Sequence, residues 1–240
     1  MPIPVEYPSK PRRTKIVATI GPACDSPDVI RAMLGAGMNV ARLNLSHGTL
    51  AEHKARLDLL RKVAADIGRH IAIMIDTRGI EIRTRTLAGG QVDLAPGDVF
   101  SLYMDDRPGD DAGVSITYSH LAEEVHRGTP ILLDDGAIEL EVRLVEADII
   151  QCVVIHGGRL GNSKSVNLPE TQLAITAVSP ENRNDVLREL GFAAENDVDY
   201  IAASFIQSAE DIFTMREILL EKDVNIPIIA KIENKAGVDN

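Results

Sequence analysis

The first third of the chain alternates between the hydrophobic patterns of strands and helices. Residues 15–20 are β-rich and stop at Gly21-Pro22, and Ser26 then caps a helix whose first residue is Pro27. Thr49 and Glu52 have capping-box spacing, which predicts a second helix after them. Because the intervening strands are almost continuously apolar, they indicate a parallel sheet covered on both faces. The strands predicted here span residues 15–20, 37–41 and 70–75.

The pattern changes between residues 79 and 173, where short β-rich runs are separated by turns rich in Gly, Pro and Asp. Ser119–His126 is the one helical segment expected there. This succession of short strands and turns predicts a small antiparallel β domain inserted into the α/β frame. Its main runs are Val99–Met104, Ile131–Leu133, Ala137–Val145 and Ile149–Ile155.

The α/β alternation returns in residues 174–240. Ser179-Pro180-Glu181 has the pattern of an N-cap and a first-turn proline, and Ser208 begins a similar helix start. Strands are expected at 199–203 and 226–232. Together with residues 14–78 this gives a frame of about five strands, whereas a closed parallel barrel has eight. Residues 1–13, which contain four prolines, are expected to form an extended tail.

Composition and charge narrow the class of partners. A chain of 240 residues with 45% hydrophobic content can bury a substantial core. The formal net charge of −11 argues against nonspecific binding to nucleic acids or membrane surfaces. Cys24 and Cys152 lack metal-ligand spacing and are expected as unpaired thiols in a reducing compartment. With no membrane-spanning run and no apolar signal segment in the sequence, we expect a cytoplasmic location.

Polar side chains follow each strand of the predicted frame. Arg42, Asn44 and Ser46 lie two residues apart, so on a strand they project from one face. Active sites of parallel α/β barrels lie at the carboxyl ends of the strands, so these groups predict a site for an anion and its counter-ion. Lys231 and Glu233 share the same spacing, although alone such a pair favours a structural ion pair. The other strand-end residues are Thr19, Asp76, Thr77 and Ser204.

Seven segments, in order and in spacing, resemble the pyruvate kinase family over residues 14–240. The resemblance implies a (β/α)8 TIM-type barrel, present here as an incomplete barrel that stops after its fifth strand. It also implies that the inserted antiparallel β-barrel domain, residues 79–173, is the family's mobile lid. We therefore expect either a fragment of a longer protein or a truncated relative. The segments are Thr14–Pro22, Arg42–Gly48, Asp76–Arg83, Leu132–Gly136, Leu160–Pro169, Ala203–Phe205 and Lys231–Asn234.

The resemblance implies phosphoryl transfer from phosphoenolpyruvate to ADP, which gives pyruvate and ATP in glycolysis. Arg42 would bind the substrate phosphate, for which its planar guanidinium is suited. Lys231 would stabilise charge on the transferring group and on the enolate oxygen. Glu233 would be a ligand of Mg²⁺ or Mn²⁺, whose sites combine carboxylates with substrate oxygens.

Monovalent-cation and nucleotide sites are implied in the same way. Asn44, Ser46, Asp76 and the carbonyl of Thr77 would form the family's K⁺ site. Family members that require K⁺ resemble this chain in carrying Glu at the position of Glu81, so K⁺ dependence is expected. The resemblance also implies a homo-oligomer, a homotetramer in the family, and nucleotide contacts from Asn44, Leu45, Ser46, His47, Arg83 and Lys164.

Several positions depart from the family pattern. Arg78 stands in place of Lys, and Ile80 in place of Pro, whose ring would fix the backbone. Ser163 and Gln207 occupy positions where basic residues are expected, which removes positive charge around the nucleotide. Glu170 occupies the position of a small residue. Two lost charged contacts would weaken ADP binding by about 1–3 kcal/mol.

Two other functions fit the same residues. One is a catalytically inactive homologue that binds a nucleotide or a partner protein. The other is a different barrel enzyme acting on phosphoenolpyruvate or pyruvate, such as a lyase or an aldolase. Three further features are given structural interpretations: Gly157–Gly161 as a loop, Asp134-Asp135 as a turn, and His53 as a surface or satisfied residue.

Overall fold

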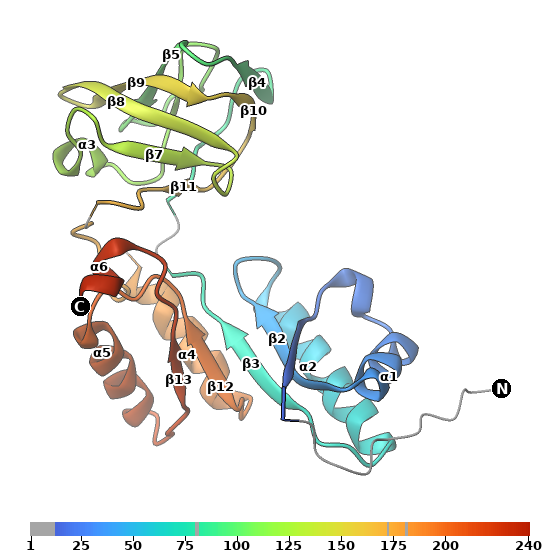
Figure 1. Cartoon of the computed structure of the whole chain (residues 1–240). Coiled ribbons are helices and arrows are strands. Elements are labelled where there is room, and N and C mark those ends of the chain that lie inside the picture. Colours follow the sequence, from blue (N-terminus) through green and yellow to red (C-terminus); the bar gives the residue numbers. More distant parts are fainter. Residues whose placement is uncertain (1–12, 80–81, 172, 181) are drawn as a thin grey trace. The chain divides into compact units, whose positions relative to one another are not determined.

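The computed structural model describes residues 13–79, 82–171, 173–180 and 182–240. The chain forms two compact units (Figure 1). The first contains the residues up to Gly79 and Ala177–Lys231, and the second contains Ile80–Thr176 and Ile232–Asn240. The predictions made for the tail, for Ile80 and for Glu81 lie outside the described residues, as does Glu181 itself.

The first unit is built on a parallel sheet with the strand order β1-β2-β3-β12-β13. All five strands fall where the hydrophobic pattern predicts them, with ends that differ by a few residues. β3 and β12 are adjacent although the second unit separates them in the sequence. The strands are β1 Ile16–Thr19, β2 Met38–Asn44, β3 Ala72–Asp76, β12 Tyr200–Ala203 and β13 Ile228–Ala230.

The first two α-helices of this unit begin at side-chain caps. The Ser26 hydroxyl accepts a hydrogen bond from the Val29 N–H at 3.3 Å, as the sequence predicts. At the next helix, the Glu52 N–H donates to the Thr49 hydroxyl at 3.3 Å, and the Thr49 N–H donates to Glu52 at 2.6 Å. The helical segments are η1 Pro22–Cys24, α1 Pro27–Ala36, α2 Leu50–Asp66, α4 Arg183–Glu195 and α5 Ala209–Leu220.

The predicted start of α4 is wrong. The helix begins at Arg183 with Asn182 as its N-cap, not at Ser179-Pro180. The Asn182 carboxamide accepts a hydrogen bond from the Ser179 N–H at 2.7 Å, and this closes a turn before the helix. The Asn182 side chain thus closes the turn that precedes α4, and the N-cap lies three residues after the serine expected from the sequence.

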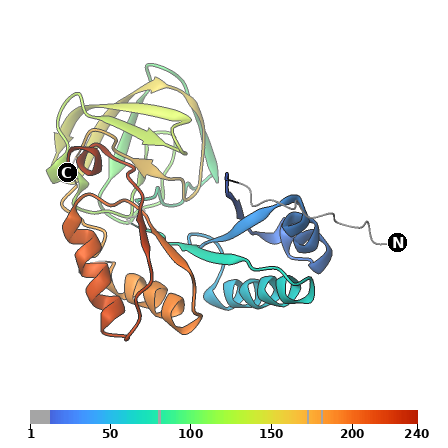
Figure 2. The same cartoon turned by 60° about the horizontal axis from the view of Figure 1, so that its bottom comes forward.

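The helices of the first unit cover one face of its sheet rather than both (Figures 1 and 2). Strand residues such as Leu43, Ile73 and Ile201 are fully buried in one core with Leu57 and Leu190 of the helices. The opposite face carries partly exposed apolar residues at its edge strands: Val17 is 50% exposed and Ile229 is 45% exposed. Strand alternation thus sends every second side chain of this sheet away from the helices.

Replacing Thr49 with alanine is expected to destabilise the first unit modestly. The change removes the hydroxyl that accepts the Glu52 N–H, one of the unpaired donors of the first turn of α2. We expect a loss of about 1 kcal/mol in the free energy of unfolding. Urea denaturation measures it, and an unchanged midpoint would show that the cap contributes nothing.

The second unit is β-rich, as predicted. It contains a six-stranded sheet with the order β11-β7-β8-β9-β5-β6 and a two-stranded sheet, β10-β4. Its core includes Phe100, Leu102, Leu140 and Cys152, and both cysteines of the chain are free thiols. Its elements are β4 Gln91–Leu94, β5 Val99–Tyr103, β6 Gly113–Ser115, α3 Leu121–Glu124, β7 Pro130–Leu133, β8 Ile138–Glu146, β9 Ile149–His156, β10 Gly158–Gly161, β11 Val166–Asn167 and α6 Lys235–Asp239.

Two expectations for this unit are wrong. Gly158–Gly161 is a strand rather than a loop, since it pairs with β4 and Arg159 forms an ion pair with Asp93 across the two strands. The β domain is also not antiparallel throughout, because β6 pairs parallel with β5. A Cβ at Gly113 would lie 2.4 Å from the Ser101 carbonyl oxygen, so the close approach of β6 requires glycine there.

Helices long and apolar enough to cross a lipid bilayer are absent from the described part of the chain.

Candidate functional site

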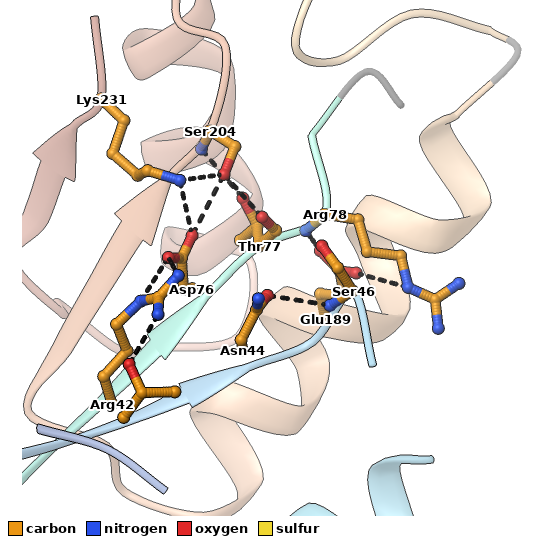
Figure 3. A network of polar contacts seen from close by, with 10 residues as sticks. Arg42, Asn44, Ser46, Asp76, Thr77, Arg78, Glu189, Ser204 and Lys231 are labelled. Carbon is orange, nitrogen blue, oxygen red and sulfur yellow. Dashed lines mark hydrogen bonds and ion pairs between the residues drawn. The ribbon is translucent and has the colours of Figure 1, made fainter. Parts of the chain in front are cut away.

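The carboxyl ends of four strands in the first unit meet at one buried carboxylate, that of Asp76 (Figure 3). Asp76 ends β3 and is 2% exposed. Arg42 of β2 donates from Nε to Oδ2 at 2.6 Å, and its Nη2 lies 2.5 Å from the same oxygen. Lys231, directly after β13, donates from Nζ to Oδ1 at 3.0 Å. One carboxylate therefore holds two cations.

The strand register explains why these residues meet. Asn44 is paired with Asp76 across β2 and β3, and Asp76 is paired with Ala202 across β3 and β12. Arg42 lies two residues before Asn44, so its side chain projects from the same face. The alternation predicted for Arg42 and Asn44 is thus the one that the sheet has, whereas Ser46 lies in the turn after β2 rather than on the strand.

Ser204 links the strand ends through a buried hydroxyl. Its Oγ accepts a hydrogen bond from Lys231 Nζ at 2.8 Å and lies 3.1 Å from Asp76 Oδ1 and 2.7 Å from the Thr77 carbonyl oxygen. Its backbone N–H donates to the Thr77 hydroxyl at 3.1 Å. A hydroxyl has one proton, so Ser204 donates to only one of these acceptors at a time.

The two cations give the site a local positive charge in an acidic chain. The side chains of Arg42 and Lys231 are 28% and 29% exposed, so both reach solvent while their charged ends contact Asp76. Arg42 also donates from Nη1 to the Thr19 hydroxyl at 2.7 Å. An anion that approaches this edge of the sheet meets two positive groups and one negative group.

A second polar cluster lies beside the network and was not predicted from the sequence. Glu189 of α4 is 5% exposed, and its Oε2 accepts a hydrogen bond from the Arg78 N–H at 3.3 Å. Arg78 in turn donates from Nε to the Leu45 carbonyl at 2.8 Å. Burial raises the pKa of Glu189 to about 7, although the Arg78 N–H and charge oppose the rise. The available signal was an acidic residue within the apolar stripe of Val186, Leu190 and Ala193.

His53 of α2 is more buried than expected, with 2% of its surface exposed. Its Nε2 lies 2.7 Å from the His47 carbonyl oxygen, while its Nδ1 has no hydrogen-bond partner among the described residues. Burial lowers the pKa of His53, so the neutral ring is favoured. The side chains of His53 and Glu189 border a cavity of about 20 Å³, close to the size that one water molecule occupies. The other lining residues are Leu45, Gly48, Leu50, Arg78, Asp185 and Arg188.

Comparison with known proteins identifies the family. The family model described as "Pyruvate kinase, barrel domain" matches residues 11–240. The chain belongs to the pyruvate kinase family. It is 43% identical over 232 residues to a pyruvate kinase of Sporosarcina psychrophila and 42% identical over 231 residues to one of Staphylococcus aureus strain USA300. Each match covers 95% of this chain and 39% of the relative, so the chain spans about two fifths of the length of these relatives.

The oxygen groups expected to form the pyruvate kinase K⁺ site lie together in the first unit. The Asn44 carboxamide oxygen accepts a hydrogen bond from the Ser46 N–H at 3.1 Å, and Asn44 is paired with Asp76 in the sheet. Together with the Thr77 carbonyl, they offer neutral oxygens and one negative charge, which fit a hard monovalent cation. Clusters of three or more His, Cys, Asp or Glu suited to a metal do not occur in the described ranges. A cation here would therefore depend on amide, hydroxyl and carbonyl oxygens together with the single carboxylate of Asp76.

Three of the pyruvate kinase positions named from the sequence, those of Arg83, Lys164 and Glu233, lie in the second unit. Arg83 donates from Nη1 to the Ser163 carbonyl at 2.6 Å, and Lys164 forms an ion pair with Asp134 at 2.8 Å. Asp134 and Asp135 lie in the turn between β7 and β8 with positive φ values, as the turn interpretation predicts. Glu233, the expected divalent-cation ligand, is exposed in the segment before α6.

Two departures from the family pattern have clear structural settings. Arg78, in place of Lys, contacts Leu45 and Glu189. Gln207, in place of a basic residue, is 5% exposed, and its N–H donates to Asp211 at 2.9 Å near the start of α5. The structure gives no reason for Glu170 or Ser163 at their positions.

Proposed function

We propose that this chain supplies the phosphoenolpyruvate-binding and cation-binding part of a pyruvate kinase, a cytoplasmic glycolytic enzyme that forms homo-oligomers. The observation that carries the proposal is the pairing of Arg42 and Lys231 with the single carboxylate of Asp76. The names of the relatives, at 42–43% identity, favour a kinase over a lyase or an aldolase.

In this proposal Arg42 and Lys231 bind the phosphate and enolate oxygens of phosphoenolpyruvate. Three of the five N–H donors of Arg42 are engaged with Asp76 and Thr19, so a phosphate contact through these three would require an exchange of partners. Asp76 would hold the two cations in place before the anion arrives. Once they turn to the phosphate, its carboxylate oxygens become available to a monovalent cation.

Phosphoryl transfer depends mainly on position and charge neutralisation. The bond between phosphorus and the enol oxygen breaks, and a bond forms from phosphorus to a terminal oxygen of ADP. The enolate left behind takes a proton at carbon to become pyruvate. In this proposal Lys231 stabilises the negative charge that develops on the enolate oxygen.

Two metal ions are part of the proposal. Mg²⁺ or Mn²⁺, when bound, would neutralise charge on phosphate oxygens, and the exposed carboxylate of Glu233 would be one of its ligands. K⁺ would be held by Asn44, Ser46, Asp76 and Thr77. We propose that Arg83 and Lys164 contact the nucleotide phosphates with Asn44, Leu45, Ser46 and His47, and that residues 79–173 act as the lid.

The decisive experiment measures pyruvate formation by the purified 240-residue chain. Phosphoenolpyruvate, ADP and Mg²⁺ are supplied with and without K⁺, and a Lys231→Met variant is assayed beside a Lys222→Met control at an exposed position of the same unit. We expect K⁺-dependent turnover that is lost in Lys231→Met and retained in Lys222→Met.

The opposite result is equally clear. The proposed roles would be overturned if the folded chain shows no turnover and Lys231→Met and Lys222→Met bind phosphoenolpyruvate with the same weak affinity. Turnover without K⁺ would contradict the assignment of Asn44, Ser46, Asp76 and Thr77.

A further inference from the structure

The turn formed by residues 44–48 is held from inside the first unit by two buried helical side chains. His53 of α2 contacts the carbonyl of His47 at 2.7 Å. Glu189 of α4 reaches the turn through Arg78, which contacts the carbonyl of Leu45. The turn carries Asn44 and Ser46, so these helices control the position of two oxygen groups of the proposed cation site.

The link through Glu189 is the more specific of the two. Glu189 Oε2 accepts the Arg78 N–H at 3.3 Å, and Oε1 lies 3.8 Å from Arg78 Nε. The same Nε donates to the Leu45 carbonyl at 2.8 Å, and the Leu45 N–H donates to the Asp76 carbonyl at 2.9 Å. Both backbone groups of Leu45 are therefore fixed to the segment that begins with Asp76 and continues into Arg78.

Stability alone does not account for a carboxylate at this position. A buried ion pair often contributes little to stability compared with apolar residues of similar size, because removing its charges from water is costly. Glu189 lies among Val186, Leu190 and Ala193, where an apolar residue would pack, and Arg78 is 46% exposed at its side chain. The carboxylate instead provides an acceptor for the Arg78 N–H, in a hydrogen bond that is partly buried.

We propose that Glu189 is a positioning residue for the monovalent-cation site: through Arg78 it fixes the Leu45 carbonyl and thereby the orientation of Asn44 and Ser46. This inference rests on the proposed function for the identity of the cation, whereas the ordering of the turn does not. Glu189 touches neither substrate nor cation in this arrangement. The hydrogen-bond acceptor at Glu189 carries the effect, and its charge is secondary.

Three variants separate these roles. Glu189→Leu removes the acceptor at nearly constant size, Glu189→Gln keeps an acceptor without charge, and Glu195→Gln changes an exposed residue of the same helix. Amide hydrogen exchange is followed at Leu45, Ser46, His47 and Gly48. We expect exchange about tenfold faster in Glu189→Leu and within about threefold of the unmodified chain in the other two.

Cation affinity is then measured directly with Tl⁺, a spectroscopic substitute for K⁺, by thallium NMR titration of the full chain. We expect Tl⁺ to bind about tenfold more weakly to Glu189→Leu, with affinity restored in Glu189→Gln. Unchanged exchange at residues 45–48 in Glu189→Leu would overturn the inference, and so would faster exchange without weaker Tl⁺ binding.

Two further outcomes are informative. If Glu189→Leu does not fold, Arg78→Met tests the same link from a partly exposed position, with the same expected changes in exchange and affinity. If the unmodified chain binds no Tl⁺, the proposed cation site fails, whereas the exchange comparison still decides whether Glu189 orders the turn.

Discussion

Replacement of Asp76 by alanine is expected to lower the free energy of unfolding by about 2–4 kcal/mol. The change leaves Arg42 and Lys231 facing each other without the carboxylate that both contact. Breaking a fully buried pair costs about 3–5 kcal/mol, and we expect somewhat less here because both cations are more than a quarter exposed. The Ser204 hydroxyl also loses one of its neighbours.

Urea denaturation followed by circular dichroism measures this effect. Asp28→Ala provides the control, since Asp28 pairs with Arg31 while 94% of its side chain is exposed, and we expect it to change the free energy of unfolding by less than about 1 kcal/mol. Asp76→Asn should fall between the two because it keeps a hydrogen-bond acceptor. Equal midpoints for Asp76→Ala and Asp28→Ala would show that Asp76 is not needed to hold the two cations.

Ionisation of Glu189 is expected to make the chain less stable as the pH rises from about 4.5 to 7. Burial raises the pKa of this carboxyl group from 4.5 to about 7, so the folded state binds a proton that the unfolded state has already released. Stability from this group is fully present below pH 4.5 and is lost as the pH rises through 7. The shift corresponds to about 3 kcal/mol.

The Glu189→Gln variant isolates this contribution. Its free energy of unfolding should equal that of the unmodified chain near pH 4.5 and exceed it by about 3 kcal/mol above pH 7. His53 has the opposite effect: its pKa is lowered by burial, so its contribution is lost as the pH falls below about 6.5. That effect is common to both proteins and cancels in the difference. A difference that does not change with pH would contradict the raised pKa.

The sequence was sufficient for features that depend on neighbouring residues. Strand alternation places Arg42 and Asn44 on one face, and the caps at Ser26 and Thr49 involve atoms three residues apart. The Arg42–Asp76 contact joins residues 34 apart, yet it could be anticipated because strand ends meet at one edge of a parallel sheet. The roles of Arg42, Asn44, Asp76 and Lys231 towards ligands stay predictions.

Other features depend on contacts that no local pattern encodes. Glu189 reaches Arg78 across 111 residues, and its position within an apolar helix stripe gave only a weak signal. Gly158–Gly161 became a strand because β4 lies beside it, although its glycines favour a loop. The N-cap of α4 is Asn182 rather than Ser179, and the Asn182 carboxamide accepts the Ser179 N–H in the turn before the helix, a contact that the N-cap pattern does not indicate.

The two ends of the β-rich insertion are joined by backbone hydrogen bonds, and this affects the expected order of folding. The Val166 N–H donates to the Ile82 carbonyl at 2.8 Å, and the Thr84 N–H donates to the Lys164 carbonyl at 2.8 Å. The Ile73 N–H donates to the Asp199 carboxylate, and this hydrogen bond between β3 and the segment before β12 closes a loop of 126 residues. If the insertion folds first, the hydrogen bonds between its ends shorten this loop to about 40 residues. The entropic cost of closing the loop then falls by about 1 kcal/mol. The domain that interrupts the sheet in sequence would then act as a cross-link that speeds the pairing of β3 with β12.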